Sequence, residues 1–256
     1  MKPIAKPTGL AFYEWQLPSS LHQGLKAMGF ENPTPIQAQG IPVVLERRDL
    51  IACAQTGTGK TGAFSIPLIA RLLRNPAKMA LILTPTRELA AKVESVVEKL
   101  TKFSPELKCA LLIDGASMQP QLRALSKHPR IIIATPGRLT DHLHRGSISL
   151  SQVEILVLDE ADRMLDMGFA PQLNEILRFL PKTRQTLLFS ATFPIDIQKM
   201  AKKFLKDPVE ITVTPEDHAQ WKEISKLLES KAGALPNVST LKKVSKAPTG
   251  TPKHTH

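Results

Sequence analysis

The sequence is poor in cysteine. Only Cys53 and Cys109 occur among its 256 residues, and both lie in short apolar runs typical of buried strands. We therefore expect them to pack in the core rather than to form a disulfide or a metal site, as in proteins of the reducing cytoplasm. No segment reaches the ~18 apolar residues of a membrane helix, the N-terminus lacks a signal peptide's apolar stretch, and the seven histidines show no metal-ligand spacing. These absences predict a cytoplasmic protein with no membrane partner.

The charge is strongly basic, with 34 Lys and Arg against 23 Asp and Glu and a formal net charge of +11. Such an excess favours a polyanionic partner, either nucleic acid or an acidic membrane surface. A basic surface that only keeps the protein soluble explains the charge equally well. The partner therefore has to be identified from motifs.

Short apolar runs alternate with longer amphipathic ones from residue 49 to 213, which predicts an α/β fold. The apolar runs are continuous, as in buried parallel strands, so we expect a mostly parallel sheet of about seven strands with helices on both faces. Ligands of such folds bind beyond the carboxyl ends of the strands. The predicted strands are residues 50–54, 79–84, 109–113, 131–134, 154–158, 185–190 and 209–213, and helices are predicted at 59–73, 87–103 and 196–204.

Three segments are distinguished by composition. Residues 1–40 contain a predicted helix at 21–28 and a Pro-rich turn, and we expect them to pack on a core domain formed by residues 41–214. Residues 217–230 are compatible with one further helix. Residues 231–256 are rich in Lys, Ser, Thr, Pro and Gly and contain no aromatic side chain. Residues 215–256 are therefore predicted to be a basic, largely disordered tail.

A phosphate-binding loop is predicted where the first strand passes through a Gly-rich turn into a helix. Gly57 and Gly59 let the backbone wrap closely, so that N–H groups point at phosphate oxygens near a positive helix N-terminus. Lys60 is placed to reach the β- and γ-phosphates, and the Thr61 hydroxyl to bind Mg²⁺. The alternative is a chance Gly-rich turn. The predicted nucleotide-binding residues are Ala54, where this loop pattern usually has its first Gly, Gln55, Thr56, Gly57, Thr58, Gly59, Lys60 and Thr61.

An acidic pair follows the apolar run 155–158. An acid at the end of a strand is what such an enzyme needs to hold magnesium, so Asp159 is a candidate metal ligand together with Thr61. Glu160 is placed to polarise the water that attacks the γ-phosphorus. With Lys60, these two acids form the predicted catalytic set. The alternative is an ordinary helix N-terminus, where acidic residues are common.

The string Asp159-Glu160-Ala161-Asp162 resembles the motif that names the DEAD-box RNA helicases, and other motifs of that family occur in the same order. The run from Gly29 to Gln37 resembles the Q motif, with Phe12 seventeen residues before its Gly. A primary amide at Gln37 can pair N6 and N7 of adenine, and Phe12 can stack on the base. The alternatives are a surface amide and a hydrophobic anchor.

The resemblance also implies a path for single-stranded RNA. Its predicted residues each lie where a strand gives way to a helix, so amides, hydroxyls and Arg side chains can contact phosphates and 2′-OH groups with little sequence preference. Ala116 stands where the family usually has a second glycine. For the arginines, helix capping or a salt bridge is the alternative. The predicted RNA-binding residues are Pro85, Thr86, Arg87, Gly115, Thr135, Pro136, Gly137 and Arg138.

Ser190-Ala191-Thr192 resembles the family's coupling motif, which implies that Ser190 or Thr192 hydrogen-bonds near Asp162. The resemblance spans about residues 10–214 and implies a RecA-like P-loop domain with ATP and Mg²⁺ as cofactors. It also implies sequence-nonspecific single-stranded or duplex RNA as partner, with RNA-processing or ribosome-assembly proteins as further candidates.

The family's second domain, which carries an HRxGR-like string, is expected after residue 213, and no such string occurs in these residues. We therefore expect the first half of an ATP-dependent RNA helicase, weakly active alone and dependent on a second domain for unwinding. Two alternatives are a non-catalytic half-helicase that competes with complete helicases and a DNA-translocating P-loop motor.

Overall fold

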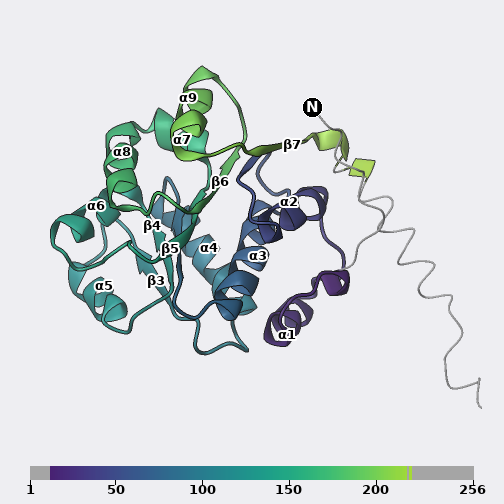
Figure 1. Ribbon diagram of the computed structural model, residues 1–256, viewed down its shortest axis with the longest axis horizontal. Helices are drawn as coiled ribbons and strands as arrows, with labels where there is room; N and C mark the ends of the chain where they lie inside the picture. The colour runs from purple at the N-terminus through teal and green to yellow at the C-terminus, as the bar shows by residue number, and fades with distance from the viewer. Residues whose placement is uncertain (1–11, 218, 221–256) are drawn as a thin grey trace, which may run out of the picture.

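The computed structural model describes residues 12–217, 219 and 220 and has a single seven-stranded sheet (Figure 1). The strand order is β3-β4-β2-β5-β6-β1-β7, and every pair is parallel, which confirms the predicted α/β class. The predicted ends of each strand lie within one residue of the observed ends. The strands are β1 Leu50–Ala54, β2 Met79–Leu83, β3 Cys109–Leu112, β4 Ile131–Ala134, β5 Val153–Leu158, β6 Gln185–Ser190 and β7 Val209–Val213.

The connecting segments form helices on both faces of the sheet. Many begin at residues that favour helix initiation, such as Thr34 before Pro35 and Thr86, whose Oγ1 accepts a hydrogen bond from Leu89 N at 3.2 Å. A short 3₁₀ helix, Phe12–Glu14, precedes the first of them. The α-helices are α1 Ser19–Ala27, α2 Pro35–Leu45, α3 Lys60–Arg74, α4 Arg87–Leu100, α5 Met118–Leu125, α6 Pro136–His144, α7 Ala161–Asp166, α8 Ala170–Phe179 and α9 Ile195–Phe204.

Two hydrophobic cores sandwich the sheet. Alternate strand residues point to opposite faces, so Val157 packs with α1–α4 and its neighbour Leu156 packs with α5–α9. Figure 1 shows the two layers, with α2 and α3 on one side of the sheet and α5, α6, α8 and α9 on the other. Leu21 and Leu25 of α1 and Ile36 of α2 lie in the first core.

Several smaller predictions can be checked against the described residues. Cys53 and Cys109 are both unpaired, as expected, although each is only partly buried. No helix in the described part of the chain is long and apolar enough to cross a membrane. The prediction of a helix at 217–230 falls almost entirely outside the described residues, and that of a disordered tail at 231–256 does so completely.

Candidate active site

Three loops with polar motifs meet at the carboxyl edge of the sheet. The loop after β1 leads into α3, the loop after β5 leads into α7, and the loop after β6 leads into α9. Strand β6 lies between β1 and β5, and Ser190 is level with Cys53 in the β1–β6 register. The topology therefore places residues 190–192 between the phosphate loop and the acidic pair.

The phosphate loop, residues 54–61, has the backbone conformation that its glycines permit. Gly57 and Gly59 have φ values of 83° and 94°, which side chains rarely allow. The Thr58 hydroxyl donates to Gln55 O at 2.8 Å, and the buried Lys60 ammonium donates to Ala54 O at 3.0 Å. Residues 55–57 are exposed. The loop thus presents a closed turn of backbone with a lysine on its inner side, the arrangement of an anion cradle.

The acidic pair combines a buried carboxylate with a conformationally restricted neighbour. Asp159 is 2% exposed, and burial raises its pKa to about 6, although the Lys60 charge acts in the opposite direction. Glu160 has a φ of 51°, its backbone N–H donates to Asp159 Oδ1 at 3.1 Å, and its carboxylate lies 3.3 Å from Arg163 Nη1. A positive φ at a non-Gly residue costs about 1–3 kcal/mol, which the surrounding structure has to offset.

Asp162 joins the acidic loop to residues 190–192. Its Oδ2 accepts hydrogen bonds from Ala191 N at 3.1 Å, Thr192 N at 3.0 Å and Thr192 Oγ1 at 3.0 Å. Burial acts to raise the pKa of Asp162, but these bonds and others outweigh it, so the pKa lies below its ordinary value. Ser190 Oγ is buried without a hydrogen bond of normal geometry, yet it contributes to the lowering. Thr192 is therefore the hydroxyl that the structure brings to Asp162.

Gln37 links the start of α2 to the phosphate loop. Its Oε1 accepts from Thr34 N at 3.0 Å, and its Nε2 donates to Gly59 O at 3.1 Å. The side chain is 4% exposed and packs so tightly that a Cβ at Gly62 would lie 2.5 Å from Nε2. An amide can make further bonds from each end. Adenine pairing by Gln37 stays a prediction, while its role as a tie to the loop is a direct observation.

A pocket of about 360 Å³ adjoins this tie. It is lined by Gly29, Phe30, Glu31, Asn32, Thr34, Gln37, Gly57 and Gly59. Phe12 is not among them. Its ring is 3% exposed, stacks on Phe30 at 6.1 Å between centroids and meets Trp15 edge-on at 5.6 Å. This packing is compatible with a hydrophobic anchor, and stacking of Phe12 on a base stays a prediction. Phe30 is the aromatic side chain on the pocket wall. Phe30 and Thr34 lie within the run Gly29–Gln37, but nothing in the sequence of that run indicated that these two residues would line a pocket.

The donor set suits magnesium and a nucleoside triphosphate. Mg²⁺ typically keeps one or two protein carboxylates and completes its octahedral shell with phosphate oxygens and water. Asp159 supplies a buried carboxylate, and the partly exposed Thr61 lies in the first turn of α3. Among the described residues there is no cluster of three or more His, Cys, Asp or Glu side chains able to hold a metal without such help.

The predicted RNA-binding residues lie at the ends of β2, β3 and β4. Thr135 Oγ1 donates to Asp114 Oδ2 at 2.7 Å, and Arg138 Nη1 donates to Ala116 O at 2.9 Å. Asp114 Oδ1 also lies 3.9 Å from Arg138 Nε, so this aspartate organises the group, a role the sequence did not reveal. Ala116 does not have a positive φ, which explains why a glycine is dispensable there.

The two arginines differ in their surroundings. Arg138 has a side chain 12% exposed and forms the salt bridge that was one of its two expected roles. Arg87 is 63% exposed, and its Nε pairs with Glu88 at 2.7 Å. Gly115 has a φ of 73°, and a Cβ there would lie 3.4 Å from Arg87 Nη1. The structure therefore brings Arg87, residues 114–116 and residues 135–138 together, with Arg87 the more accessible cation.

Comparisons with known proteins agree with this geometry. The DEAD/DEAH box helicase family model matches residues 34–200. The ATP-dependent rRNA helicase rrp-3 of Neurospora crassa is 45% identical over 210 residues, which is 81% of this chain and 41% of that protein. The ATP-dependent RNA helicase DRS1 of Eremothecium gossypii is 50% identical over 202 residues, 77% of this chain and 28% of that protein.

A solved structure gives the same result. The DEAD box protein from the hyperthermophile Methanococcus jannaschii superposes with a TM-score of 0.76 and 41% identity, covering 81% of this chain and 57% of that one. The fold is thus RecA-like, as expected. The chain spans less than half the length of the curated relatives named above. By family model, relatives and fold, this chain belongs to the DEAD/DEAH box helicase family.

Proposed function

We propose that this chain is the nucleotide-binding half of an ATP-dependent RNA helicase that binds ATP with Mg²⁺ and single-stranded RNA. The observation that carries the proposal is the convergence of Lys60, Asp159 and the Asp162–Thr192 link at one sheet edge, beside a pocket closed by Gln37. This chain alone is expected to hydrolyse ATP slowly with stimulation by RNA, and fast hydrolysis and strand separation depend on a second domain. The alternative, a non-catalytic half-helicase, differs in that it binds nucleotide and RNA but hydrolyses no ATP.

Each residue of the loops has a role in this proposal. Backbone N–H groups of residues 55–59 and the Lys60 ammonium hold the phosphates, and Thr61 with Asp159 holds the metal. Mg²⁺ held by these residues would supply positive charge to offset the charge of the phosphates. Glu160 accepts the proton of the water whose oxygen bonds to the γ-phosphorus as the bond to the bridging oxygen breaks.

The RNA contacts are proposed on the neighbouring strand ends. Arg87, with amides and hydroxyls of residues 85, 86, 115 and 135–138, binds phosphates and 2′-OH groups rather than bases. Affinity is therefore expected to fall with salt and to vary little with sequence. Ser190 and Thr192 transmit nucleotide state through Asp162. We propose a cytoplasmic protein working with RNA-processing or ribosome-assembly partners, since rrp-3 is described as an rRNA helicase.

Two variants test the site. Lys60→Ala should abolish Mg²⁺-dependent binding of a fluorescent ATP analogue, because it removes the one buried cation beside the loop. Glu160→Gln should retain that binding and abolish RNA-stimulated turnover under single-turnover conditions. Lys92→Ala, an exposed lysine on α4, is the matched control and should change neither.

The results separate the two readings. If the folded parent protein binds the analogue equally well with EDTA and with Mg²⁺, the assignment of the metal site is wrong. Binding without any turnover that RNA stimulates would favour the non-catalytic half-helicase.

A further inference from the structure

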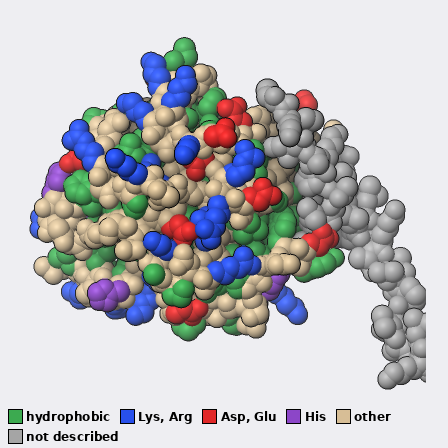
Figure 2. Space-filling view, viewed as in Figure 1, with side chains coloured by type: hydrophobic (Ala, Val, Ile, Leu, Met, Phe, Trp, Pro, Cys, Tyr) green, Lys and Arg blue, Asp and Glu red, His purple; other side chains and the backbone are tan. Residues whose placement is uncertain are grey.

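Among the described residues, the surplus of positive over negative charge is concentrated in one segment. Residues 170–206, from α8 through β6 to α9, hold seven Lys and Arg against two Asp and Glu, a surplus of five. Residues 12–217 together hold twenty-five against twenty-one, a surplus of only four. The remaining described residues are therefore close to neutral. Figure 2 shows several blue side chains on the face that carries α8 and α9, among others elsewhere in the view.

Exposed apolar side chains gather near the same segment. The described residues include five large hydrophobic side chains that are exposed, and three of them flank the ends of α7, α8 and α9. These are Met167 at 49%, Phe179 at 44% and Ile195 at 67% exposure. Isolated exposed apolar side chains are common, so these three add only that the ends of α7, α8 and α9 present apolar groups to solvent.

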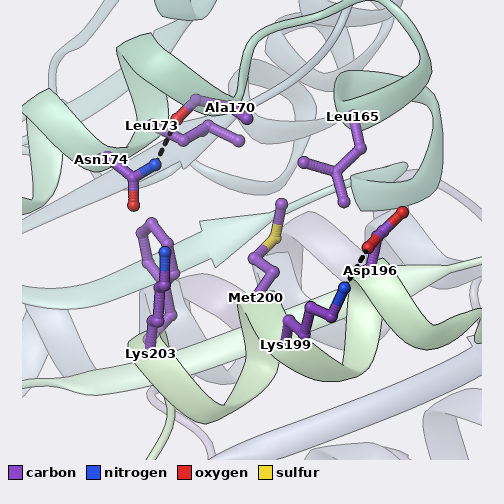
Figure 3. A pocket seen from close by; sticks show the side chains of 9 residues that line it. Leu165, Ala170, Leu173, Asn174, Asp196, Lys199, Met200 and Lys203 are labelled. Atoms are coloured by element: carbon purple, nitrogen blue, oxygen red, sulfur yellow. Dashed lines mark hydrogen bonds and ion pairs between the residues drawn. The ribbon is translucent and has the colours of Figure 1, made fainter.

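A pocket of about 270 Å³ opens between α7, α8 and α9 (Figure 3). Its floor consists of Leu173, Met200 and Phe204, all at most 6% exposed, with Leu165 on one wall. Helix α8 packs mainly on α6 and helix α9 on α7, which leaves the groove between α8 and α9. The pocket is therefore an apolar hollow of the size that receives a large hydrophobic side chain.

The rim of this pocket is polar and mainly positive. Asn174 Nδ2 is held by Ala170 O at 2.7 Å, and Asp196 is neutralised by Lys199 at 3.0 Å. Lys203 also lines the pocket and has no ion pair in the described part of the protein. Figure 3 shows these side chains around the apolar floor.

A second hollow of about 420 Å³ continues from the first at Lys203 and Phe204. Its cations include Lys182, Lys203 and Lys206, and its single carboxylate, Asp49, already accepts backbone N–H groups of Thr186 at 2.8 Å and Lys206 at 2.6 Å. Asp49 is buried and satisfied, and within the described residues the exposed Lys182, Lys203 and Lys206 form no ion pair.

From this juxtaposition we propose that the α8–α9 groove docks an acidic segment of another protein that inserts large apolar side chains into the pocket. The apolar floor anchors those side chains, and the lysines of the rim and of the second hollow pair with the flanking Asp and Glu. RNA is the less suitable occupant, because its phosphates would meet the lysines but leave the apolar floor unfilled. A second copy of this chain is also disfavoured, since two such basic faces repel each other.

A designed peptide tests the proposal on the complete 256-residue chain. The probe is a fluorescein-labelled peptide of about 14 residues, with Leu and Phe four positions apart and Asp and Glu elsewhere, so that both apolar side chains share one helical face. A second peptide replaces Leu and Phe by Ser, and a labelled oligouridylate of similar length serves as the RNA probe. Fluorescence anisotropy reports binding, and thermal unfolding verifies that each variant is folded.

Two variants probe the two halves of the groove. Lys199→Glu with Lys203→Glu should weaken binding of the Leu/Phe peptide about tenfold or more, because two attractive charges become repulsive. Ala170→Phe, at an exposed position on the rim, should fill the pocket. It should weaken binding of the Leu/Phe peptide by about as much as the double lysine variant does. Lys92→Glu with Lys99→Glu, two exposed positions on α4, is the matched control and should change affinity less than twofold.

Three results would overturn the proposal. The first is no saturable binding of the Leu/Phe peptide up to about millimolar concentration. The second is equal binding of the Ser peptide, which would mean charge attraction without a groove. The third is loss of oligouridylate affinity in the Lys199→Glu, Lys203→Glu variant together with unchanged peptide affinity, which would make this face an RNA-binding surface.

Discussion

The tie made by Gln37 is the contact through which the start of α2 can control the phosphate loop, and removing it is a decisive perturbation. Gln37→Ala deletes an acceptor for Thr34 N and a donor to Gly59 O. Both backbone groups lie in partly buried surroundings, where a lost partner costs about 1–3 kcal/mol. Because water can enter from the adjoining pocket, we expect the two together to lower the free energy of unfolding by about 2 kcal/mol.

The effect on ligand binding should exceed what stability alone explains. Gly59 is at the turn that positions the loop N–H groups, so a loose carbonyl there misplaces the whole cradle. We expect the dissociation constant of a fluorescent ATP analogue to rise about tenfold, or about 1.4 kcal/mol. Urea unfolding followed by circular dichroism gives the stability, and titration of the analogue with Mg²⁺ gives the affinity.

Gln121→Ala is the matched control. Gln121 is 5% exposed, and its Nε2 donates to Ile113 O and Ser117 O, each at 3.2 Å. Gln121→Ala should lower the free energy of unfolding by a similar amount. It should leave the affinity for the ATP analogue within about twofold of the parent protein. Equal affinities for Gln37→Ala and the parent protein would refute the reasoning.

A complementary variant leaves the amide in place. At Gly62, a Cβ would lie 2.5 Å from Gln37 Nε2, so Gly62→Ala should displace the amide. It should therefore weaken binding of the ATP analogue as Gln37→Ala does. If Gly62→Ala binds normally, then the position of this amide does not govern the loop.

Two further predictions concern the acidic loop. The pKa of Asp159 in the folded protein is about 6, above the ordinary 3.8, so folding favours the protonated carboxyl. In the unligated protein this contribution to the free energy of unfolding is fully present below pH ~4. About 3 kcal/mol of it is lost by neutral pH. Asp159→Asn should therefore raise the urea midpoint at pH 8 but hardly change it at pH 4, whereas a midpoint unchanged at pH 8 would contradict the burial argument. Asp162→Ala removes the acceptor of three hydrogen bonds from residues 191 and 192. We expect it to reduce stimulation of ATP turnover by RNA in an assay with the complete enzyme more than about tenfold, with analogue affinity changed less than threefold, and equal loss of both would show a purely structural role.

The fold was predictable because its signals are local. Each strand is a short apolar run, and each run ends at a polar or turn-forming residue, so the bounds were accurate to one residue. The clearest error is at α4, predicted to extend to residue 103 but ending at Leu100. Thr101 Oγ1 bonds back to Val97 O at 2.9 Å, and the chain turns there. A side-chain bond of this kind competes with helix propagation and leaves no mark in the apolar pattern.

The site was predictable in composition but not in its connections. The motifs identified which segments would meet at the carboxyl edge, since parallel strands end on the same side. The bonds from Gln37 to Gly59 and from Thr192 to Asp162 join residues 22 and 30 positions apart, and neither is encoded by a local string. Phe12 illustrates the opposite limit: one aromatic residue supports both a base-stacking and a packing role until its neighbours are known.

Two buried aspartates differ in how the fold satisfies them, and this difference supports the proposed ligand site at the carboxyl edge of the sheet. Asp49 precedes β1 at the amino edge and is 7% exposed, and its two oxygens accept short bonds from backbone N–H groups of Thr186 and Lys206. Asp159 follows β5 at the carboxyl edge and is 2% exposed. Within the described residues it accepts a single hydrogen bond, from its neighbour at 3.1 Å, and burial raises its pKa to about 6. A buried carboxylate costs stability unless it is satisfied. Asp49 is satisfied by the fold and fastens β1 to β6 and α9, whereas Asp159 retains acceptor capacity that only a cation can use fully. Replacing each by Asn should therefore change stability in opposite directions, and that opposition distinguishes a structural carboxylate from one reserved for a ligand.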